Sequence, residues 1–129
     1  MNTISKTITT NIDDRGVATV SMNNPDKHNA FDDAIIIELT NAFQQLADDD
    51  SVRIVVLAAE GKSFSAGADL NWMQRMANYS HSENLRDSHA LAEMLRVLNF
   101  MPKPTIARVQ GAAFGGAVGL VSCCDMAVA

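Results

Sequence analysis

Two glycine-containing segments have the residue types and the surroundings needed to bind a developing negative charge. FSAGADL spans 64–70 and GAAFGGAVG spans 111–119, and each follows an apolar run and leads into a helical pattern. At a helix N-terminus the backbone N–H groups lack intrahelical acceptors and favour negative charge. Two such loops lying side by side could direct two N–H groups at one oxygen atom, an oxyanion hole worth roughly 3–4 kcal/mol per donor. The glycines are equally compatible with simple close packing of helices on strands.

The elements that must position these loops are buried strands and the helices that follow them. The continuous apolar run 52–59 and the segment 104–111 predict strands buried on both faces, as in a parallel sheet, and 125–129 predicts a last strand. In a parallel sheet, ligands bind beyond the carboxyl ends of the strands. The sequence therefore places both glycine segments at one edge of the sheet.

The rest of the chain predicts one hairpin and four helices. Alternating residues in 4–12 and 17–22, separated by the turn cluster 13–16, predict a β-hairpin. Helices are predicted from Asp32 or Asp33 through Leu46, as a short helix capped by Asp69, over 82–99 and over 115–124. This alternation of elements predicts an α/β fold with a mostly parallel sheet and helices packed on it.

Several competing motifs fail on spacing. A phosphate-binding P-loop ending at Gly61-Lys62-Ser63 would need a glycine where Val56 stands, and neither G-x-G-x-x-G nor G-x-S-x-G occurs. His89 and Glu93 lie four residues apart in a polar helical pattern, which favours a solvated pair over metal ligands. No metal site is predicted.

The composition is that of a globular intracellular protein. The chain has 129 residues, 47% hydrophobic and 19% charged, with a net charge of -5 and no basic run, which argues against nucleic-acid binding. The adjacent Cys123 and Cys124 form neither a disulfide framework nor a zinc spacing, and the N-terminus lacks an apolar leader. The apolar stretch 104–129 contains Arg108 and Asp125, which disfavours a membrane span. A cytoplasmic location is expected.

Three strings in this order resemble the crotonase (enoyl-CoA hydratase/isomerase) superfamily: NNPDKHNAF, VLAAEGKSFSAGADL and GAAFGGAVGLVSCCDMAVA. The resemblance runs from about Ile4 to Ala129, and FSAGADLNWM and ARVQGAAFGGAVGL are most similar to the bacterial methylglutaconyl-CoA and γ-carboxygeranoyl-CoA hydratase branch of leucine and isoprenoid catabolism. It implies a crotonase-like superhelix of repeated ββα units. Since family members are longer, residues 1–129 are expected to be the N-terminal part of a single core domain.

The resemblance also implies roles for particular residues. The two oxyanion N–H groups would come from Ala68 and Gly116. The remaining substrate contacts would come from the DKHNA loop, the FSAGADL loop and the short helix after it: Lys27, Ala30, Ala66, Gly67, Asp69, Leu70, Trp72 and Met73. The Ala66 backbone would meet the adenine of coenzyme A. Lys27 is a candidate phosphate contact or a solvated lysine, and Trp72 and Met73 would shape the acyl pocket or belong to the core.

One position departs from the family pattern. Many hydratases of the superfamily carry a catalytic glutamate three residues after the oxyanion glycine, and Gly119 stands there in this chain. The second family glutamate would lie beyond Ala129. Asp125 is better interpreted as a structural carboxylate at the start of a strand.

The leading functional prediction is therefore an enzyme that hydrates 2-enoyl-CoA thioesters through an enolate, with no cofactor, since coenzyme A is part of the substrate. An isomerase, decarboxylase or thioester hydrolase of the same superfamily, and a non-catalytic CoA-thioester-binding half-domain, stay open. RNA binding is disfavoured by the net charge of -5. Neither nucleic acid nor a membrane is expected as a partner, and the resemblance implies a homotrimer or hexamer.

Overall fold

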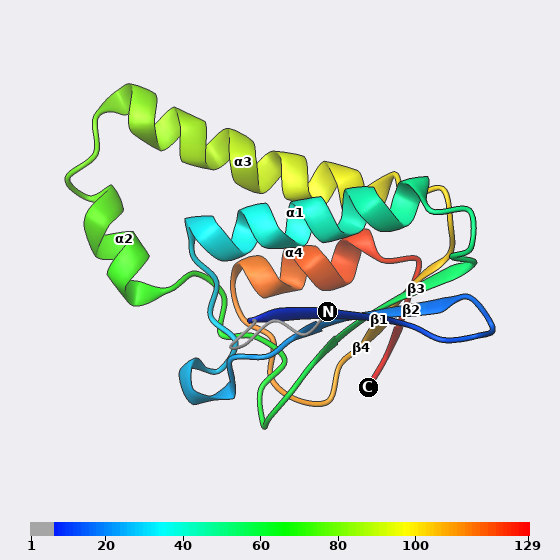
Figure 1. Ribbon diagram of the computed structural model, residues 1–129. Helices are drawn as coiled ribbons and strands as arrows, with labels where there is room; N and C mark the ends of the chain where they lie inside the picture. Colours follow the sequence, from blue (N-terminus) through cyan, green and yellow to red (C-terminus); the bar gives the residue numbers. More distant parts are fainter. Residues whose placement is uncertain (1–6) are drawn as a thin grey trace.

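A five-stranded sheet forms the base of the fold, and the longer helices lie along one face (Figure 1). The structure is a computed structural model and describes residues 7–129. The strands follow one another across the sheet in chain order: β1 (Ile8–Ile12), β2 (Val17–Met22), β3 (Ile54–Ala59), β4 (Thr105–Arg108) and β5 (Met126–Val128). Only the β1–β2 pair is antiparallel, so the prediction of a mostly parallel α/β sheet is confirmed.

The predicted hairpin is the β1–β2 pair. Its turn is closed by Asp13, whose Oδ1 accepts hydrogen bonds from the backbone N–H groups of Arg15 (2.9 Å) and Val17 (3.0 Å). The side chains of Arg15 and Asp13 also form an ion pair, and this hydrogen bonding lowers the pKa of the Asp13 carboxyl. The predicted start at 4 lies outside the described residues.

The helices begin where capping side chains occur in the sequence. Their bounds are α1 (Asp33–Asp48), α2 (Leu70–Met76), α3 (His81–Asn99) and α4 (Gly116–Cys123), with a 3-10 turn η1 (Pro25–Lys27). Asp32 caps α1 and Asp69 caps α2, as predicted, each accepting a backbone N–H three residues later. Ser80 and Glu83 form a reciprocal capping box, so α3 begins one residue before the predicted 82.

The core lies between the sheet and the helices. One face of α1 buries Ile36, Leu39, Phe43 and Leu46, while α3 contributes Met94, Val97 and Leu98. These side chains pack with the inward residues of β2 and β3 in a single apolar cluster. Helices α1, α3 and α4 lie on the same side of the sheet (Figure 1). The N-terminus of α4 lies over the same end of the sheet as the loop that leads into α2.

The C-terminal end of α1 is held by a lysine that is distant in sequence. The ammonium of Lys103 donates hydrogen bonds to the backbone carbonyls of Leu46 and Asp49, the latter at 2.5 Å. These carbonyls belong to the last turn of the helix, where a positive charge is favoured.

Lys103→Met is expected to lower the free energy of unfolding by about 2 kcal/mol, since it leaves these carbonyls without their charged donor. Urea denaturation of the variant measures this loss, and Lys62→Met, which changes an exposed lysine, is the matched control. Equal midpoints for the two variants would contradict the capping role.

Among the described residues 7–129, no helix combines the length and the apolar character needed to cross a lipid bilayer.

Candidate functional site

Three segments that are distant in sequence lie side by side beyond the carboxyl ends of the strands. Phe31 forms an isolated parallel bridge with Ala68, and Ser65 forms another with Ala113. The FSAGADL loop is therefore the middle segment, flanked by the end of the 23–31 loop and by the start of the GAAFGG loop. The sequence prediction that both glycine segments meet at one edge of the sheet agrees with this arrangement.

The Ala68 peptide is oriented by its neighbours. Phe31 N–H donates to the Gly67 carbonyl (2.8 Å), and Asp69 N–H donates to the Phe31 carbonyl (2.8 Å). In a bridge of this kind, the N–H and C=O of the residue between the two bonds point to the opposite side. Ala68 N–H is therefore directed toward the GAAFGG loop, and it has no acceptor among residues 7–129.

The second amide lies at the N-terminus of α4. Ala117 N–H donates to Phe114 O (3.0 Å) and Val118 N–H donates to Gly115 O (3.0 Å), which closes the first turn. Gly116 N–H, at the first helical position, has no acceptor in the described part of the chain. It is therefore available to a ligand at the positive end of the helix dipole.

The three segments approach each other closely at two glycines, Gly67 and Gly116. A side chain on Gly67, which has φ +90°, would place its Cβ 2.7 Å from Phe114 O and 3.5 Å from the Gly116 nitrogen. A Cβ on Gly116 would lie 2.7 Å from Cζ of the buried Phe31 ring. Phe31 thus supports both halves of the site, since its backbone pairs beside Ala68 and its ring lies against Gly116.

A pocket of about 500 Å³ adjoins the Ala68 side of this site. Its walls combine the 27–30 loop with the FSAGADL loop and the start of α2: Lys27, His28, Ala30, Ala66, Ala68, Asp69, Leu70 and Asn71. Six of these residues are predicted site residues. Lys27 is exposed and its ammonium forms no ion pair with any of residues 7–129, so an anionic group could approach it.

The remaining predicted residues lie outside the pocket walls. Trp72 is only 3% exposed and belongs to the core, and its indole N–H donates to Asp87 of α3 (3.1 Å). Met73 of α2 is 49% exposed. Of the two interpretations given to Trp72, core packing describes its observed surroundings.

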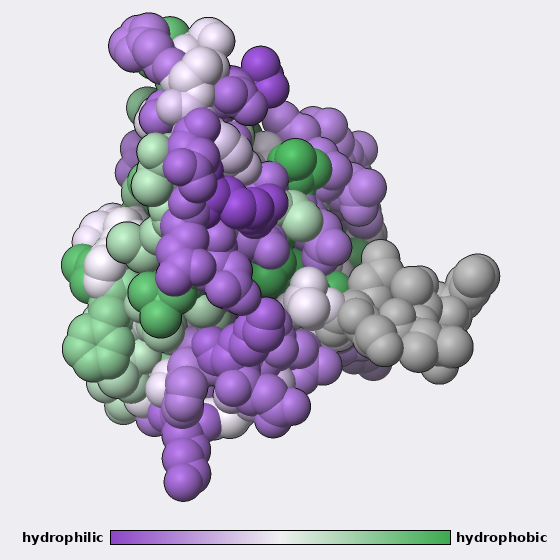
Figure 2. All heavy atoms as spheres, turned by 90° about the vertical axis from the view of Figure 1, so that its left-hand side faces the viewer, coloured by the Kyte–Doolittle hydropathy of each residue, from purple (hydrophilic) through white to green (hydrophobic). Residues whose placement is uncertain are grey.

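Exposed apolar side chains gather on the side of the molecule that carries α2 and both loops. Leu70, Met73, Phe114 and Val118 are each about half exposed or more. Figure 2 faces this side and shows apolar patches between polar side chains. Phe114 and Val118 flank the Gly115-Gly116 pair in sequence, so an apolar acyl chain could lie beside the unpaired Gly116 amide.

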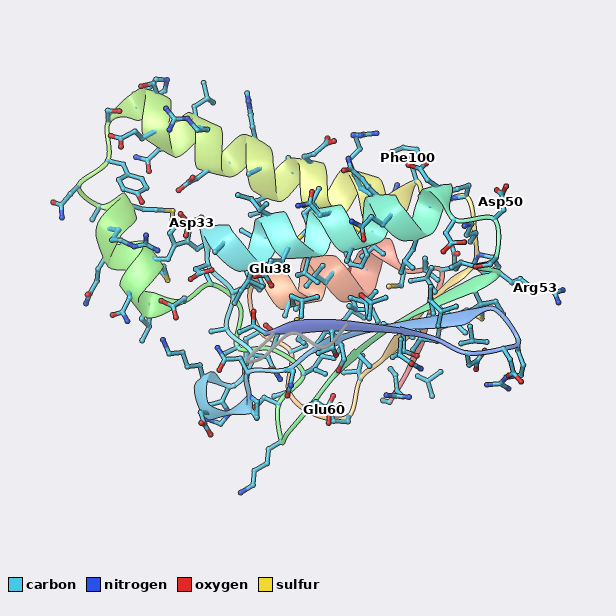
Figure 3. All side chains as sticks on the ribbon, in the orientation of Figure 1. Asp33, Glu38, Asp50, Arg53, Glu60 and Phe100 are labelled. Carbon is cyan, nitrogen blue, oxygen red and sulfur yellow. The ribbon has the colours of Figure 1, made fainter. Side chains whose placement is uncertain are left out.

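Three carboxylates that could act as acids or bases, those of Glu60, Glu93 and Asp125, are engaged elsewhere. Glu93 pairs with Arg96 on the exposed face of α3, rather than with His89. Asp125 accepts hydrogen bonds from the backbone N–H and the hydroxyl of Thr105, which agrees with a structural role. Glu60 accepts from Ser21, and Figure 3 shows it below the sheet, whereas α4 lies above it.

Position 119 faces α3. A Cβ added to Gly119 would lie 3.5 Å from both δ-carbons of Leu95, an ordinary van der Waals contact. Position 119, where the family resemblance implies a glutamate in many hydratases, therefore lies against the apolar side chain of Leu95 in this chain.

Both cysteine thiols are partly buried, which disfavours the thiolate form. Burial raises the pKa of Cys124 to about 11 and also raises the pKa of Cys123. A thiol with such a pKa stays protonated near neutral pH. Within residues 7–129, no group of three or more His, Cys, Asp or Glu side chains could hold a metal ion.

A protein-family model matches most of this chain. The model of the enoyl-CoA hydratase/isomerase family matches residues 13–129. The chain belongs to this family. The match begins in the β1–β2 turn and covers both loops, the pocket and α4.

Individual members of the enoyl-CoA hydratase/isomerase family agree with this assignment. A candidate enoyl-CoA hydratase of Thermus thermophilus is 39% identical over 87% of the chain, and 4-chlorobenzoyl coenzyme A dehalogenase-1 of an Arthrobacter species is 38% identical over 88%. The crystal structure of a candidate enoyl-CoA hydratase/isomerase (crotonase) from Legionella pneumophila is 47% identical over 96% of the chain, with a TM-score of 0.92. These matches confirm the α/β crotonase-type fold.

The chain spans less than half the length of these family members: 44% of the Thermus protein, 41% of the Arthrobacter protein and 48% of the Legionella chain. The names of the first two differ in reaction, one being a hydratase and the other a dehalogenase. Family membership alone therefore leaves the reaction open.

Several residues of the site lie in or beside the predicted loops, but the sequence alone assigns them no individual role. His28 lines the pocket with its ring Nδ1 3.1 Å from Ser63 Oγ, and Asn71 lies in the first turn of α2. Phe31 and Ser65 connect the loops. Each of these roles depends on contacts between residues more than 30 positions apart. The spacing of neighbouring residues in the sequence does not predict such contacts.

Proposed function

We propose that this chain forms part of an acyl-CoA-processing enzyme in which Ala68 N–H and Gly116 N–H hold the thioester oxygen. The single observation that carries the proposal is that these two amides lack acceptors and lie on loops in direct contact. A thioester oxygen gains negative charge when an enolate forms. Two preorganised N–H donors stabilise that charge more than they stabilise the neutral carbonyl.

The adjoining pocket supports the orientation of the substrate. The nucleotide end of coenzyme A would lie at the 27–30 loop and Ala66, with Lys27 near a phosphate, and the acyl end would lie toward Phe114 and Val118. Since coenzyme A belongs to the substrate, the proposal includes no separate cofactor.

Hydration of a 2-enoyl-CoA is the reaction we propose first, in the methylglutaconyl-CoA and γ-carboxygeranoyl-CoA hydratase branch. The resemblance of FSAGADLNWM and ARVQGAAFGGAVGL to that branch supports it. A glycine at 119 instead of a glutamate favours the alternatives, namely isomerisation, decarboxylation or hydrolysis of a CoA thioester, or binding without catalysis. A cytoplasmic homotrimer or hexamer acting without nucleic acid or membrane remains the expectation.

The binding proposal is tested by calorimetric titration with two ligands that differ at one oxygen. Crotonyl-CoA carries the thioester carbonyl, and S-(trans-but-2-enyl)-CoA has a methylene group in its place. We expect crotonyl-CoA to bind about tenfold more tightly, because two hydrogen bonds to the carbonyl are lost in the thioether. Equal affinities would contradict the oxyanion hole, and absence of binding by both ligands would contradict the CoA pocket.

A further inference from the structure

Ser65 is a buried serine whose hydroxyl connects two segments of the site. Its side chain is 0% exposed. Ser65 Oγ donates a hydrogen bond to the backbone carbonyl of Asn29 (2.8 Å) and accepts one from the backbone N–H of Gly67 (3.1 Å). A serine hydroxyl has a single hydrogen, so donation to Asn29 turns a lone pair toward Gly67.

The backbone of Ser65 connects the third segment. Ser65 N–H donates to Ala112 O (3.2 Å), and Ser65 O accepts from Phe114 N–H (3.0 Å). One residue therefore contacts the pocket loop, the loop of Ala68 and the loop of Gly116.

The residue that carries this carbonyl, Asn29, is itself held by hydrogen bonds of its side chain. Asn29 is 2% exposed, and its side-chain amide donates to Glu60 O (2.8 Å) and Ser63 O (3.0 Å). Its side-chain oxygen accepts from Asn24 N–H (2.7 Å). The loop that carries Lys27 and Ala30 is thus hydrogen-bonded to the loop after β3. A displacement of the loop that carries Lys27 would therefore move the acceptor of the Ser65 hydroxyl.

We infer that Ser65 is a positioning residue, whose hydroxyl fixes the peptides of Gly67 and Ala68 relative to the pocket loop and so aims the Ala68 amide. The inference rests on the proposed function for its catalytic meaning. Gly67 has φ +90°, a conformation with little intrinsic preference to hold the next peptide in place. The hydrogen bond from Gly67 N–H to the Ser65 hydroxyl restrains the peptide before Gly67, and Phe31 N–H, which donates to Gly67 O (2.8 Å), restrains the peptide after it.

Amide hydrogen exchange measures this positioning without a substrate. In ¹⁵N-labelled protein, Ser65→Ala is expected to speed exchange at Gly67 about tenfold and to shift the Ala68 resonance, because the acceptor of Gly67 N–H is gone. Ser122→Ala is the matched control, since it removes an exposed hydroxyl that donates to Val118 O within α4. Changes at Gly67 and Ala68 no larger than in this control would overturn the inference.

A second variant covers the case in which Ser65→Ala does not fold. Ser65→Cys keeps nearly the same volume and replaces the hydroxyl by a weaker acceptor, so exchange at Gly67 is expected to rise there as well. Unchanged exchange in folded Ser65→Cys would also overturn the inference.

The consequence for ligand binding has its own readout. Bound crotonyl-CoA in the wild-type protein is expected to show a lowered carbonyl stretching frequency, and Ser65→Ala is expected to reduce this shift while S-(trans-but-2-enyl)-CoA binds within about twofold of wild type. A full carbonyl shift in Ser65→Ala would count against positioning. If wild-type protein binds no thioester, the proposed function fails, and the exchange measurement still decides the role of Ser65.

Discussion

Residues 1–129 by themselves are expected to bind an enoyl-CoA thioester without adding water to it at a measurable rate. Hydration needs a proton acceptor and a proton donor within hydrogen-bond reach of the reacting carbons, and each such group contributes about 10²–10⁴-fold to the rate. Glu93 and Asp125 are engaged with Arg96 and Thr105, and Gly119 carries no acid–base group. The oxyanion hole alone stabilises charge but transfers no proton.

Loss of the conjugated enoyl thioester, followed by ultraviolet absorbance with crotonyl-CoA, measures this rate. A chimera in which residues 1–129 are followed by the unmatched remainder of the Legionella pneumophila chain is the positive control, since that relative has 47% identity to this chain. We expect turnover in the chimera and none in the 129-residue chain. Clear turnover by the chain itself would mean that an acid–base residue among its own side chains has been overlooked.

Gly116→Pro in that chimera is expected to lower the rate about 10²–10³-fold relative to Gly116→Ala, because proline removes one of the two oxyanion donors. Gly116 is the first residue of α4, a position where proline is well accepted in helices, and the residue before it is also glycine. Both substitutions place a Cβ against the Phe31 ring, at 2.7 Å in the unrelaxed structure. Alanine therefore reproduces the Cβ contact with Phe31 and keeps the N–H group.

The comparison requires that both variants fold, which circular dichroism and urea denaturation establish. If Gly116→Pro and Gly116→Ala have the same rate in folded protein, the amide of Gly116 has no part in stabilising the oxyanion. The destabilisation shared by the two variants reports the contact with Phe31, for which overpacking costs about 1–3 kcal/mol.

Features that depend on local sequence could be predicted well. The helix starts at Asp33 and Leu70 follow from capping aspartates, and the β1–β2 hairpin follows from the turn cluster at 13–16. Strand β3 begins at Ile54 rather than at the predicted 52. Arg53 and Ile54 donate their backbone N–H groups to Gly16 O, so pairing with a distant turn sets that boundary.

Features that depend on tertiary contacts could be predicted only in part. Loop position alone indicated that the segments of Ala68 and Gly116 meet, because parallel strands bring their following loops to one edge of the sheet. The indole N–H of the buried Trp72 finds its acceptor on α3, at Asp87. Phe31 and Ser65 hold the site loops through contacts among three segments that are distant in sequence. The family resemblance suggested the oxyanion amides but contains no information about these supporting contacts.

The most direct test of the central claim is an amide-resolved NMR titration of ¹⁵N-labelled protein with crotonyl-CoA and, separately, with S-(trans-but-2-enyl)-CoA. Both ligands should shift the resonances of the pocket residues, including Ala66 and Asp69. Crotonyl-CoA alone should move the amide protons of Ala68 and Gly116 strongly downfield, because only its carbonyl oxygen can accept hydrogen bonds from them. Identical shifts of these two amides with both ligands would contradict the assignment of Ala68 and Gly116 as an oxyanion hole.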